Sequence, residues 1–209
     1  MCQFMSGVIT KNKTWFDLDQ DSHEFLITKA GLKDKTNSPD FVRVELLPKD
    51  NNIFNHNMSN WQIKVDQDFR PDWFSEKFAE AEMKKALKVL IAERFIINSN
   101  KLEERRDQRI FVAKSKVKVY KCVVQARGNS SVEAWGNSSV VARENSSVVA
   151  RGNSSVVAWE NSSIIIPNYS WTTNNAKIKD IQDFASVKDL RVNKIFVAAK
   201  ELKLELFKA

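Results

Sequence analysis

The sequence is poor in the residues on which most recognisable catalytic and metal sites depend. Its 209 residues include only two cysteines and two histidines. Cys2 and Cys122 lie far apart without metal-ligand spacing, and two cysteines are too few for a disulfide scaffold. Because structural disulfides accumulate in oxidising compartments, their scarcity favours a reducing, cytoplasmic setting.

Glycine-rich loops and long apolar runs are also missing. The five glycines form neither a phosphate-binding loop nor a Gly-x-Ser-x-Gly motif. No apolar run approaches the roughly 20 residues that a membrane helix needs. The first residues show no basic region followed by an apolar one, so we expect no secretory signal. We therefore expect no cofactor and no membrane association.

Positive charge is concentrated on both sides of a repeated segment. Residues 1–100 sum to −1 and residues 101–123 to +5, whereas residues 124–170 are neutral and residues 171–209 sum to +3. Clustered positive charge can attract nucleic acid or an acidic partner. The alternative is a solvated face that keeps the protein soluble.

Residues 1–100 are predicted to form a small α/β sandwich-like domain. Apolar and polar residues alternate along several short segments, as is typical of half-buried strands. The predicted strands lie near residues 2–10, 15–18, 41–48 and 61–69.

Two helices are expected between these strands. The first should begin at Asp21 or Ser22, either of which can accept hydrogen bonds from the free amides of a first turn, and stop at Gly31. The second is predicted from about Pro71 to Ile97, because apolar residues recur there every three or four positions. This apolar face comprises Ala79, Met83, Ala86, Leu87, Leu90 and Ile91.

A histidine surrounded by carboxylates offers one candidate for chemistry. His23 lies beside Asp19, Asp21 and Glu24, an arrangement that acid–base catalysis or metal binding could use. The structural alternative is a histidine at a capped helix start, where acidic residues are also favoured electrostatically. His56 lies in a polar loop with less support. We assign no catalytic and no metal-binding residue.

Residues 124–167 repeat one octad, Gly/Glu-Asn-Ser-Ser-Val-x-Ala-Arg/Trp. A short, fixed period with strand and turn chemistry predicts a β-solenoid. Four strand residues span about 13 Å, so one octad cannot run out and return around a core. Each octad should therefore form one side of a two-sided coil of about 16 residues. The five Asn-Ser-Ser triplets match a glycosylation sequon, but we interpret them as turns.

The glycines of the repeat suggest that its two edges differ. Gly136 and Gly152 are sixteen residues apart, and Glu144 and Glu160 occupy the same octad position between and after them. Because glycine adopts positive φ at little cost, one edge is expected to require it and the other not. The Asn and Ser side chains should stack between coils and satisfy backbone groups.

Strand alternation assigns the octad positions to an inside and an outside. The expected interior positions are Val124, Val132, Val140, Val148, Val156, Ile164, Ala126, Ala134, Ala142, Ala150 and Ala158. Arg127, Arg143 and Trp159 should line one outer face, and Trp135 and Arg151 the other. Arginine and tryptophan are enriched at binding hot spots and can stack on bases. The alternative is that arginine stacks on tryptophan and only covers the sheet.

Basic segments flank the octads. Residues 109–121 resemble residues 194–208, and we interpret both as strand–turn–strand caps. Lys114, Lys116 and Lys118 are expected to share one strand face, where they either bind a partner or prevent edge pairing. Residues 101–109 are interpreted as a charged connector. The segment after the octads, residues 171–192, either continues the solenoid with irregular coils or holds a short helix near residues 181–184.

The layout resembles that of small phage and prophage proteins of unassigned function. The similarity rests on the "DSHE" turn at Asp21–Glu24, the "FVRVEL" strand at Phe41–Leu46 and the octads at 124–167. It implies an α/β domain joined to an octad solenoid and a mobile-element origin, and it brings no catalytic residues. The octads also loosely resemble ice-nucleation coils, but Val-x-Ala-Arg/Trp replaces their Thr-x-Thr row, which argues against ice binding.

These observations predict an α+β protein with an α/β domain at 1–100 and a strand-capped β-solenoid at 101–209. The expected function is non-enzymatic binding of a protein or ribonucleoprotein, with nucleic-acid contact through the basic flanks. Its most specific form is a phage-encoded inhibitor of a bacterial defence complex, such as a CRISPR-type nuclease. The alternatives are a self-associating structural solenoid or an enzyme with a site near His23. The candidate binding residues are Arg127, Trp135, Arg143, Arg151, Trp159, Lys114, Lys116 and Lys118.

Overall fold

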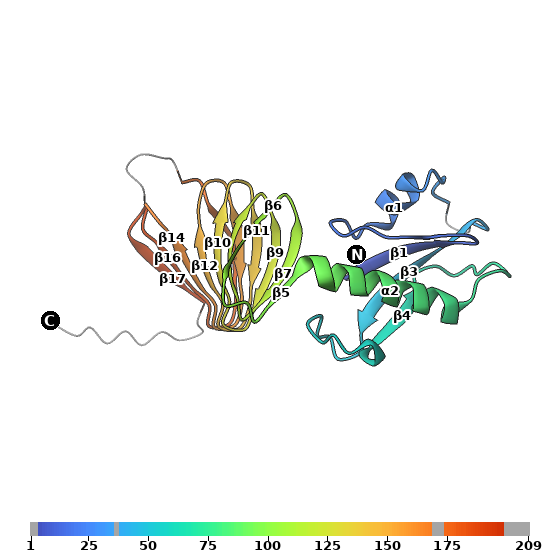
Figure 1. Cartoon of the computed structure of the whole chain (residues 1–209). Helices are drawn as coiled ribbons and strands as arrows, with labels where there is room; N and C mark the ends of the chain where they lie inside the picture. The colour runs from blue at the N-terminus through green and yellow to red at the C-terminus, as the bar shows by residue number, and fades with distance from the viewer. Residues whose placement is uncertain (1–3, 36–37, 169–173, 199–209) are drawn as a thin grey trace. The chain divides into compact units, whose positions relative to one another are not determined.

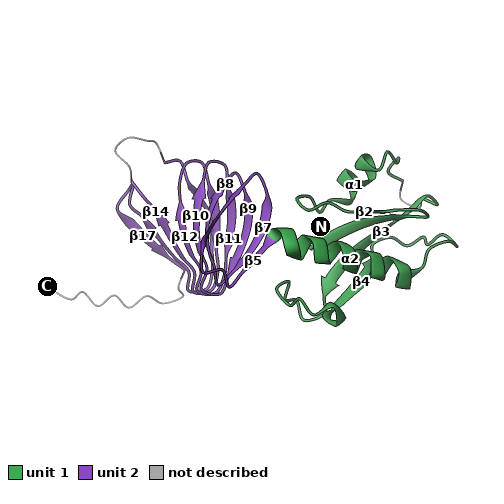
Figure 2. Ribbon diagram, in the orientation of Figure 1, with its two compact units in different colours: residues 1–94 green, residues 95–209 purple. Residues whose placement is uncertain are grey.

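The computed structural model describes residues 4–35, 38–168 and 174–198. The chain divides into two compact units, Met1–Arg94 and Phe95–Ala209, which Figure 2 colours separately. The first is a small α/β unit and the second a two-sided β-solenoid, which confirms the expected α+β fold.

Unit 1 contains a four-stranded antiparallel sheet with the order β2-β1-β3-β4. The strands are β1 (Met5–Thr10), β2 (Thr14–Trp15), β3 (Phe41–Pro48) and β4 (Trp61–Val65). Each predicted strand is present, although β2 and β4 are shorter than expected. A short 3-10 helix, η1 (Met58–Asn60), leads into β4.

The first helix, α1 (His23–Lys29), begins where the sequence predicts. Of the two capping candidates, Ser22 caps the helix, because its hydroxyl accepts a hydrogen bond from the Phe25 amide over 3.2 Å. Leu26 of α1 is buried in a cluster with Val8 and Phe41 of the sheet. The chain leaves the helix through Gly31, whose φ of 71° suits glycine.

The second helix, α2 (Glu76–Arg94), covers the opposite sheet face. Gly7 alternates with Val8 along β1, and a Cβ on Gly7 would lie 2.3 Å from the Met83 sulfur. A side chain at this position would have to displace the end of the Met83 side chain and would lie 3.2 Å from Val44 Cγ2. The predicted apolar face is buried at Ala79, Met83, Ala86, Leu87 and Leu90, whereas Ile91 is half-buried.

The predicted bounds of this helix, 71–97, are wrong at both ends. Before it, the Phe74 amide donates to the Pro71 carbonyl over 2.9 Å in a turn. After it, Phe95–Ile97 form strand β5, which pairs in parallel with β7 (Arg109–Ala113). Phe95 stacks on Phe111 with 4.6 Å between ring centroids. This long-range pairing, which helical periodicity does not reveal, ends the helix at Arg94.

Unit 2 consists of two sheets whose strands stack coil upon coil (Figure 1). The six-stranded sheet has the order β15-β13-β11-β9-β7-β5, and the seven-stranded sheet has the order β17-β16-β14-β12-β10-β8-β6. The remaining strands of the six-stranded sheet are β9 (Val123–Arg127), β11 (Ser139–Ala142), β13 (Ser155–Ala158) and β15 (Lys177–Ile181). Those of the seven-stranded sheet are β6 (Leu102–Arg106), β8 (Lys116–Tyr120), β10 (Ser131–Trp135), β12 (Ser147–Ala150), β14 (Ser163–Ile166), β16 (Ser186–Asp189) and β17 (Lys194–Val197).

The strand registers confirm the sixteen-residue coil. Val132 pairs with Val148 in one sheet, and Val140 pairs with Val156 in the other. Every predicted interior valine, isoleucine and alanine of the octads is buried and belongs to one continuous core. The small alanine side chains let the two sheets approach each other closely. Each coil buries its interior side chains only because neighbouring coils stack on it.

The predicted difference between the two edges is wrong. Gly136 and Gly152 have φ of 62°, but Glu144 and Glu160 on the other edge also have positive φ, 56° and 59°. On the glutamate edge, side-chain carboxylates compensate for the strained backbone. The Gly128 amide donates to the Glu144 carboxylate over 2.8 Å, and the Glu144 amide donates to Glu160 over 2.7 Å.

Serine supplies most of the turn chemistry that the triplets suggested. The first serine of each triplet is buried, and its hydroxyl donates to the carbonyl three residues earlier at several corners. Ser138, for example, reaches the Trp135 carbonyl over 2.7 Å. The asparagines are exposed, although Asn153 accepts a hydrogen bond from Asn175 over 3.2 Å. Serine also links neighbouring coils, because the Cys122 amide donates to the Ser138 hydroxyl over 3.2 Å and the Ser146 hydroxyl donates to the Gly128 carbonyl over 3.3 Å.

The segments outside the octads extend the solenoid further than expected. Residues 101–109 are not a connector, because β6 pairs in register with β8 and turns Glu103 and Arg105 towards the inside, where they form a 3.0 Å ion pair. Residues 177–189 continue the solenoid, as the first of the two alternatives predicted. The segment 194–208 begins as β17, and the strand predicted after it lies outside the described residues.

Candidate functional site

A row of cations and aromatic rings crosses the outer face of the seven-stranded sheet. Its members occupy equivalent positions on consecutive coils, because Arg106 pairs with Tyr120 and Tyr120 with Trp135. The Arg151 amide donates to the Ala134 carbonyl over 2.8 Å, which places Arg151 next in the row. We name this row the aromatic ladder; it comprises Arg106, Tyr120, Trp135 and Arg151.

The side chains of the aromatic ladder stack on one another. The Arg106 guanidinium lies 3.9 Å from the Tyr120 ring centroid, and the Arg151 guanidinium lies 4.8 Å from that of Trp135. The two rings are stacked with centroids 6.2 Å apart and planes 20° apart. Cations thus pack against both rings, as cation–π attraction favours.

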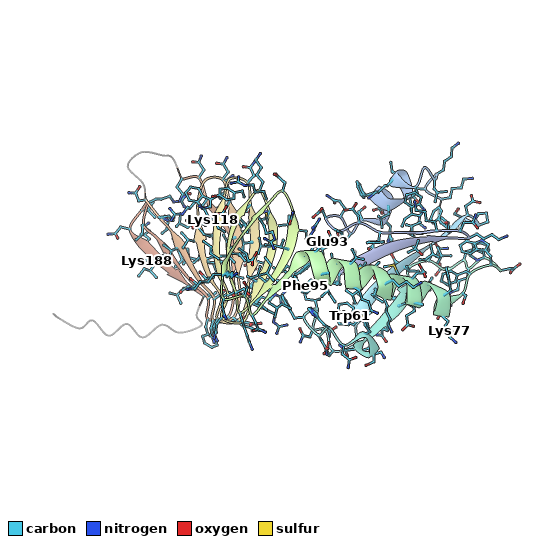
Figure 3. The ribbon with its side chains drawn as sticks, in the orientation of Figure 1. Trp61, Lys77, Glu93, Phe95, Lys118 and Lys188 are labelled. Atoms are coloured by element: carbon cyan, nitrogen blue, oxygen red, sulfur yellow. The ribbon has the colours of Figure 1, made fainter. Side chains whose placement is uncertain are left out.

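Lys118, which Figure 3 labels on the solenoid, lies two residues before Tyr120 on β8 and therefore on the same face as the ladder. Its Nζ is 5.4 Å from the Tyr120 centroid and 5.5 Å from that of Trp135. Hydrogen bonding to Tyr120, aided by the nearby Glu104 and Glu133 carboxylates, raises the pKa of Lys118. Lys118 therefore carries its positive charge throughout the neutral pH range.

The three candidate lysines do not share one strand face. Lys116 and Lys118 point outwards from β8, but Lys114 lies in the preceding turn with φ of 49°. The lysines also do not protect a sheet edge, because β8 pairs with β6 on one side and β10 on the other. Two additional coil strands, β5 and β6, precede β7 and β8, which is why the expected edge lies inside the sheet.

On the six-stranded sheet, Arg127, Arg143 and Trp159 are aligned as predicted. The Arg143 amide donates to the Ala126 carbonyl over 2.9 Å, and the Trp159 amide to the Ala142 carbonyl over 3.0 Å. The Arg143 guanidinium covers the Trp159 ring at 4.1 Å. The Trp159 indole donates to the Asp180 carboxylate over 3.1 Å, which fixes the orientation of the ring.

The arginines fall into two groups according to their partners. Arg127 forms an ion pair with Glu144, and Arg151 forms one with Glu133 at 2.7 Å, so their charges are compensated. Among the described residues, no carboxylate pairs with the guanidinium of Arg106 or Arg143. The guanidinium groups of these two arginines lie over aromatic rings and have hydrogen-bond donors available for a partner.

Two residues of this surface were missed by sequence reasoning, Arg106 and Tyr120. The segment around Arg106, Leu102–Arg106, carries four charged residues and gives no apolar alternation on its own. The signal in the sequence was the aromatic residue Tyr120, which occupies on β8 the position that Trp135 occupies on β10. Extending the alignment one coil towards the N-terminus reaches Tyr120, and a second coil reaches Arg106.

In unit 1, the geometry of His23 favours a structural role. Its side chain is 3% exposed, and Nε2 lies 3.0 Å from the Val44 carbonyl oxygen. Nδ1 lies 3.4 Å from an Asp66 carboxylate oxygen, and the nearby Asp19 pairs with Arg94 at 3.1 Å. Within the described residues, no cluster of histidine, cysteine and carboxylate side chains could hold a metal ion.

Two open hollows lie on the surface of the described residues. One in unit 1 has a volume of about 340 Å³ and is lined in part by Lys13, Phe16 and Lys85. The other, in the solenoid, has a volume of about 550 Å³ and is lined in part by Lys177 and Arg191. Neither of these two hollows is lined by His23 or by a residue of the aromatic ladder.

No match to this chain was found among protein-family models, curated proteins or solved structures. In the part of the chain that the structure describes, no helix has the length and apolar character needed to cross a membrane. The resemblance to phage and prophage proteins therefore stays a prediction from the sequence.

Proposed function

We propose that this protein is a non-enzymatic binding protein that uses the outer face of the seven-stranded sheet. We name the part formed by β6, β8 and β10, at one end of this sheet, the basic face; it comprises Arg106, Lys116, Lys118, Tyr120 and Trp135. The observation that carries the proposal is the stacking of Arg106 on Tyr120 at 3.9 Å. A cation already held in one orientation loses little conformational entropy when a partner binds.

The chemistry of the basic face favours a partner with carboxylates or phosphates. A guanidinium stacked on a ring keeps its in-plane N–H groups available for bidentate contacts with such anions. Base stacking is less favoured, because Arg106, Lys118 and Arg151 already lie near the ring faces. The partner class is thus a protein or ribonucleoprotein that presents anionic groups, with nucleic-acid contact through phosphates.

The most specific form of the proposal draws on the resemblance to phage and prophage proteins. In that form the protein inhibits a bacterial defence complex in the host cytoplasm, such as a nucleic-acid-guided, CRISPR-type nuclease. The basic face would contact phosphates of the guide or acidic residues around the groove that holds it. A rigid solenoid suits this task, since it presents these cations at fixed spacing.

An enzyme with a site near His23 is the less favoured alternative. His23 is buried between a backbone carbonyl and the Asp66 carboxylate, away from the hollow of unit 1. A His23→Ala variant that keeps its fold and loses a phenotype while retaining partner binding would favour the enzyme.

The proposal is tested by affinity capture of partners from bacterial lysate, with and without nuclease treatment. The triple variant Arg106→Ala, Lys116→Ala and Lys118→Ala should lose the captured partner. The matched control, Arg127→Ala on the other sheet, removes an arginine whose charge Glu144 already compensates and should retain it. Loss of capture after nuclease treatment would identify a nucleic-acid bridge.

Retention of the partner by the triple variant would refute the basic face as the binding surface. Because surface substitutions of this kind change stability by only about 0.5 kcal/mol, the variant should still fold. A circular-dichroism melt of both variants checks this point. A companion variant, Arg143→Ala, tests whether the six-stranded sheet contributes instead.

A further inference from the structure

The terminal strand of the seven-stranded sheet, β17, is unusually exposed. It pairs antiparallel with β16, and among the described residues no strand pairs with its other side (Figure 1). Three consecutive apolar residues on it are exposed, Ile195 at 67%, Phe196 at 41% and Val197 at 40%. An exposed apolar edge of this kind can pair with another chain.

Two of the other edge strands of the solenoid, β6 and β15, carry features that prevent such pairing. β6 is Leu-Glu-Glu-Arg-Arg, so charged side chains occupy most of it. β15 contains Lys177, Lys179 and Asp180, and its register with β13 shifts at a bulge. Charges and bulges are the usual means of blocking edge-to-edge association. β17 has one charge, on Lys194, and neither proline nor a bulge.

The two faces of β17 are both apolar. Phe196 lies opposite the buried Val187, so it continues the interior column of the solenoid beyond the last coil. Ile195 lies opposite Lys188 on the outer face. The Ala198 amide donates to the Ala185 carbonyl over 3.0 Å, which brings the end of β17 next to Phe184, itself 74% exposed. The apolar patch therefore extends from the strand to the neighbouring turn.

We infer that β17 is the interface of a homodimer, in which a second copy of this chain adds its own β17 antiparallel across a two-fold axis. Centred on Phe196, this pairing sets Phe196 against the partner's Phe196 and Ile195 against the partner's Val197. Lys194 then lies opposite the partner's Ala198, so no like charges face each other. The strand is thus self-complementary, as a two-fold interface requires.

The pairing would join the seven-stranded sheets of two copies into one continuous sheet. It does not depend on the basic face, because β17 and β8 lie at opposite ends of the sheet order. Dimerisation would place two basic faces on one assembly, which strengthens binding to a partner with repeated anionic groups.

Sedimentation velocity over a wide range of protein concentration tests the dimer. The full chain should form dimers reversibly, and Ile195→Lys, which adds a charge to the edge, should weaken the dimer by about 30-fold, as loss of a central interface residue does. Phe25→Lys is the control, because Phe25 in α1 is also an exposed apolar residue and lies outside β17. This variant should dimerise like the original chain.

Several outcomes would overturn the inference. A chain that stays monomeric at every concentration, or that dimerises equally well with Ile195→Lys, rules out β17 as the interface. A monomeric full chain that dimerises once residues 199–209 are deleted would show that this segment covers the edge, which also refutes the homodimer. Loss of partner capture by the basic-face variant leaves all of these results unchanged, so the two proposals fail separately.

Discussion

Two glycines on one edge of the solenoid provide a matched test of how closely the coils stack. Gly136 and Gly152 occupy the same octad position on consecutive coils, and both have φ of 62°. A Cβ on Gly152 would lie 3.0 Å from the Gly136 nitrogen and 3.3 Å from its Cα. A Cβ on Gly136 would meet the Lys121 side chain at an ordinary 3.6 Å. Alanine therefore meets a rigid neighbour at one position only.

The expected costs follow from these contacts. Gly136→Ala should lower the free energy of unfolding by about 1 kcal/mol, because alanine disfavours the left-handed backbone. Gly152→Ala should lose the same amount and a further amount of about 1 to 3 kcal/mol, because its Cβ must displace backbone atoms of Gly136 on the preceding coil. A backbone cost of only about 1 kcal/mol is consistent with the other edge of the solenoid, because Glu144 and Glu160 carry side chains at positive φ there.

Hydrogen–deuterium exchange of solenoid peptides during chemical denaturation would measure both variants, since its signal comes from unit 2 alone. Gly152→Ala should lower the free energy of unfolding by at least about 1 kcal/mol more than Gly136→Ala. Equal losses for the two variants would refute the reasoning, because they would mean that adjacent coils yield without cost.

Three further predictions concern other contacts. Glu144→Gln removes the carboxylate charge that faces the Gly128 amide and Arg127, and it should lower the free energy of unfolding by about 1 kcal/mol in chemical denaturation. Unchanged stability of this variant would contradict the prediction. Hydrogen bonding from Arg191 lowers the pKa of Asp189 in the folded protein. The ionised Asp189 therefore stabilises the fold fully above the ordinary carboxyl pKa of about 3.9, and this stabilisation is lost as pH falls through the lower pKa of the folded state. Asp189→Asn should flatten the acid limb of the stability–pH curve; an unchanged curve contradicts this. Leu87→Ala should destabilise unit 1 by about 2 to 5 kcal/mol in thermal unfolding, whereas exposed Val89→Ala should cost far less.

The candidate surface was predictable only in part. The octad spacing predicts that Arg127, Arg143 and Trp159 align, and the strand registers confirm it. Which arginines are compensated was not predictable, because Glu133 and Glu144 reach their partners across coils. The same spacing places Trp135 beside Arg151, but Arg106 and Tyr120 join them only through the pairing of β6 with β8.

The sequence by itself determined the sixteen-residue coil, its interior and the first capped helix. These features arise from short-range patterns of apolar and polar residues. In the octads the same pattern recurs, so each octad favours the same strand and turn. Tertiary structure alone decided that Phe95–Ile97 and Leu102–Arg106 are strands. Locally, the first continues a helical apolar pattern and the second is almost entirely charged. Both become strands because β7 and β8 offer backbone hydrogen bonds along one open side of the solenoid.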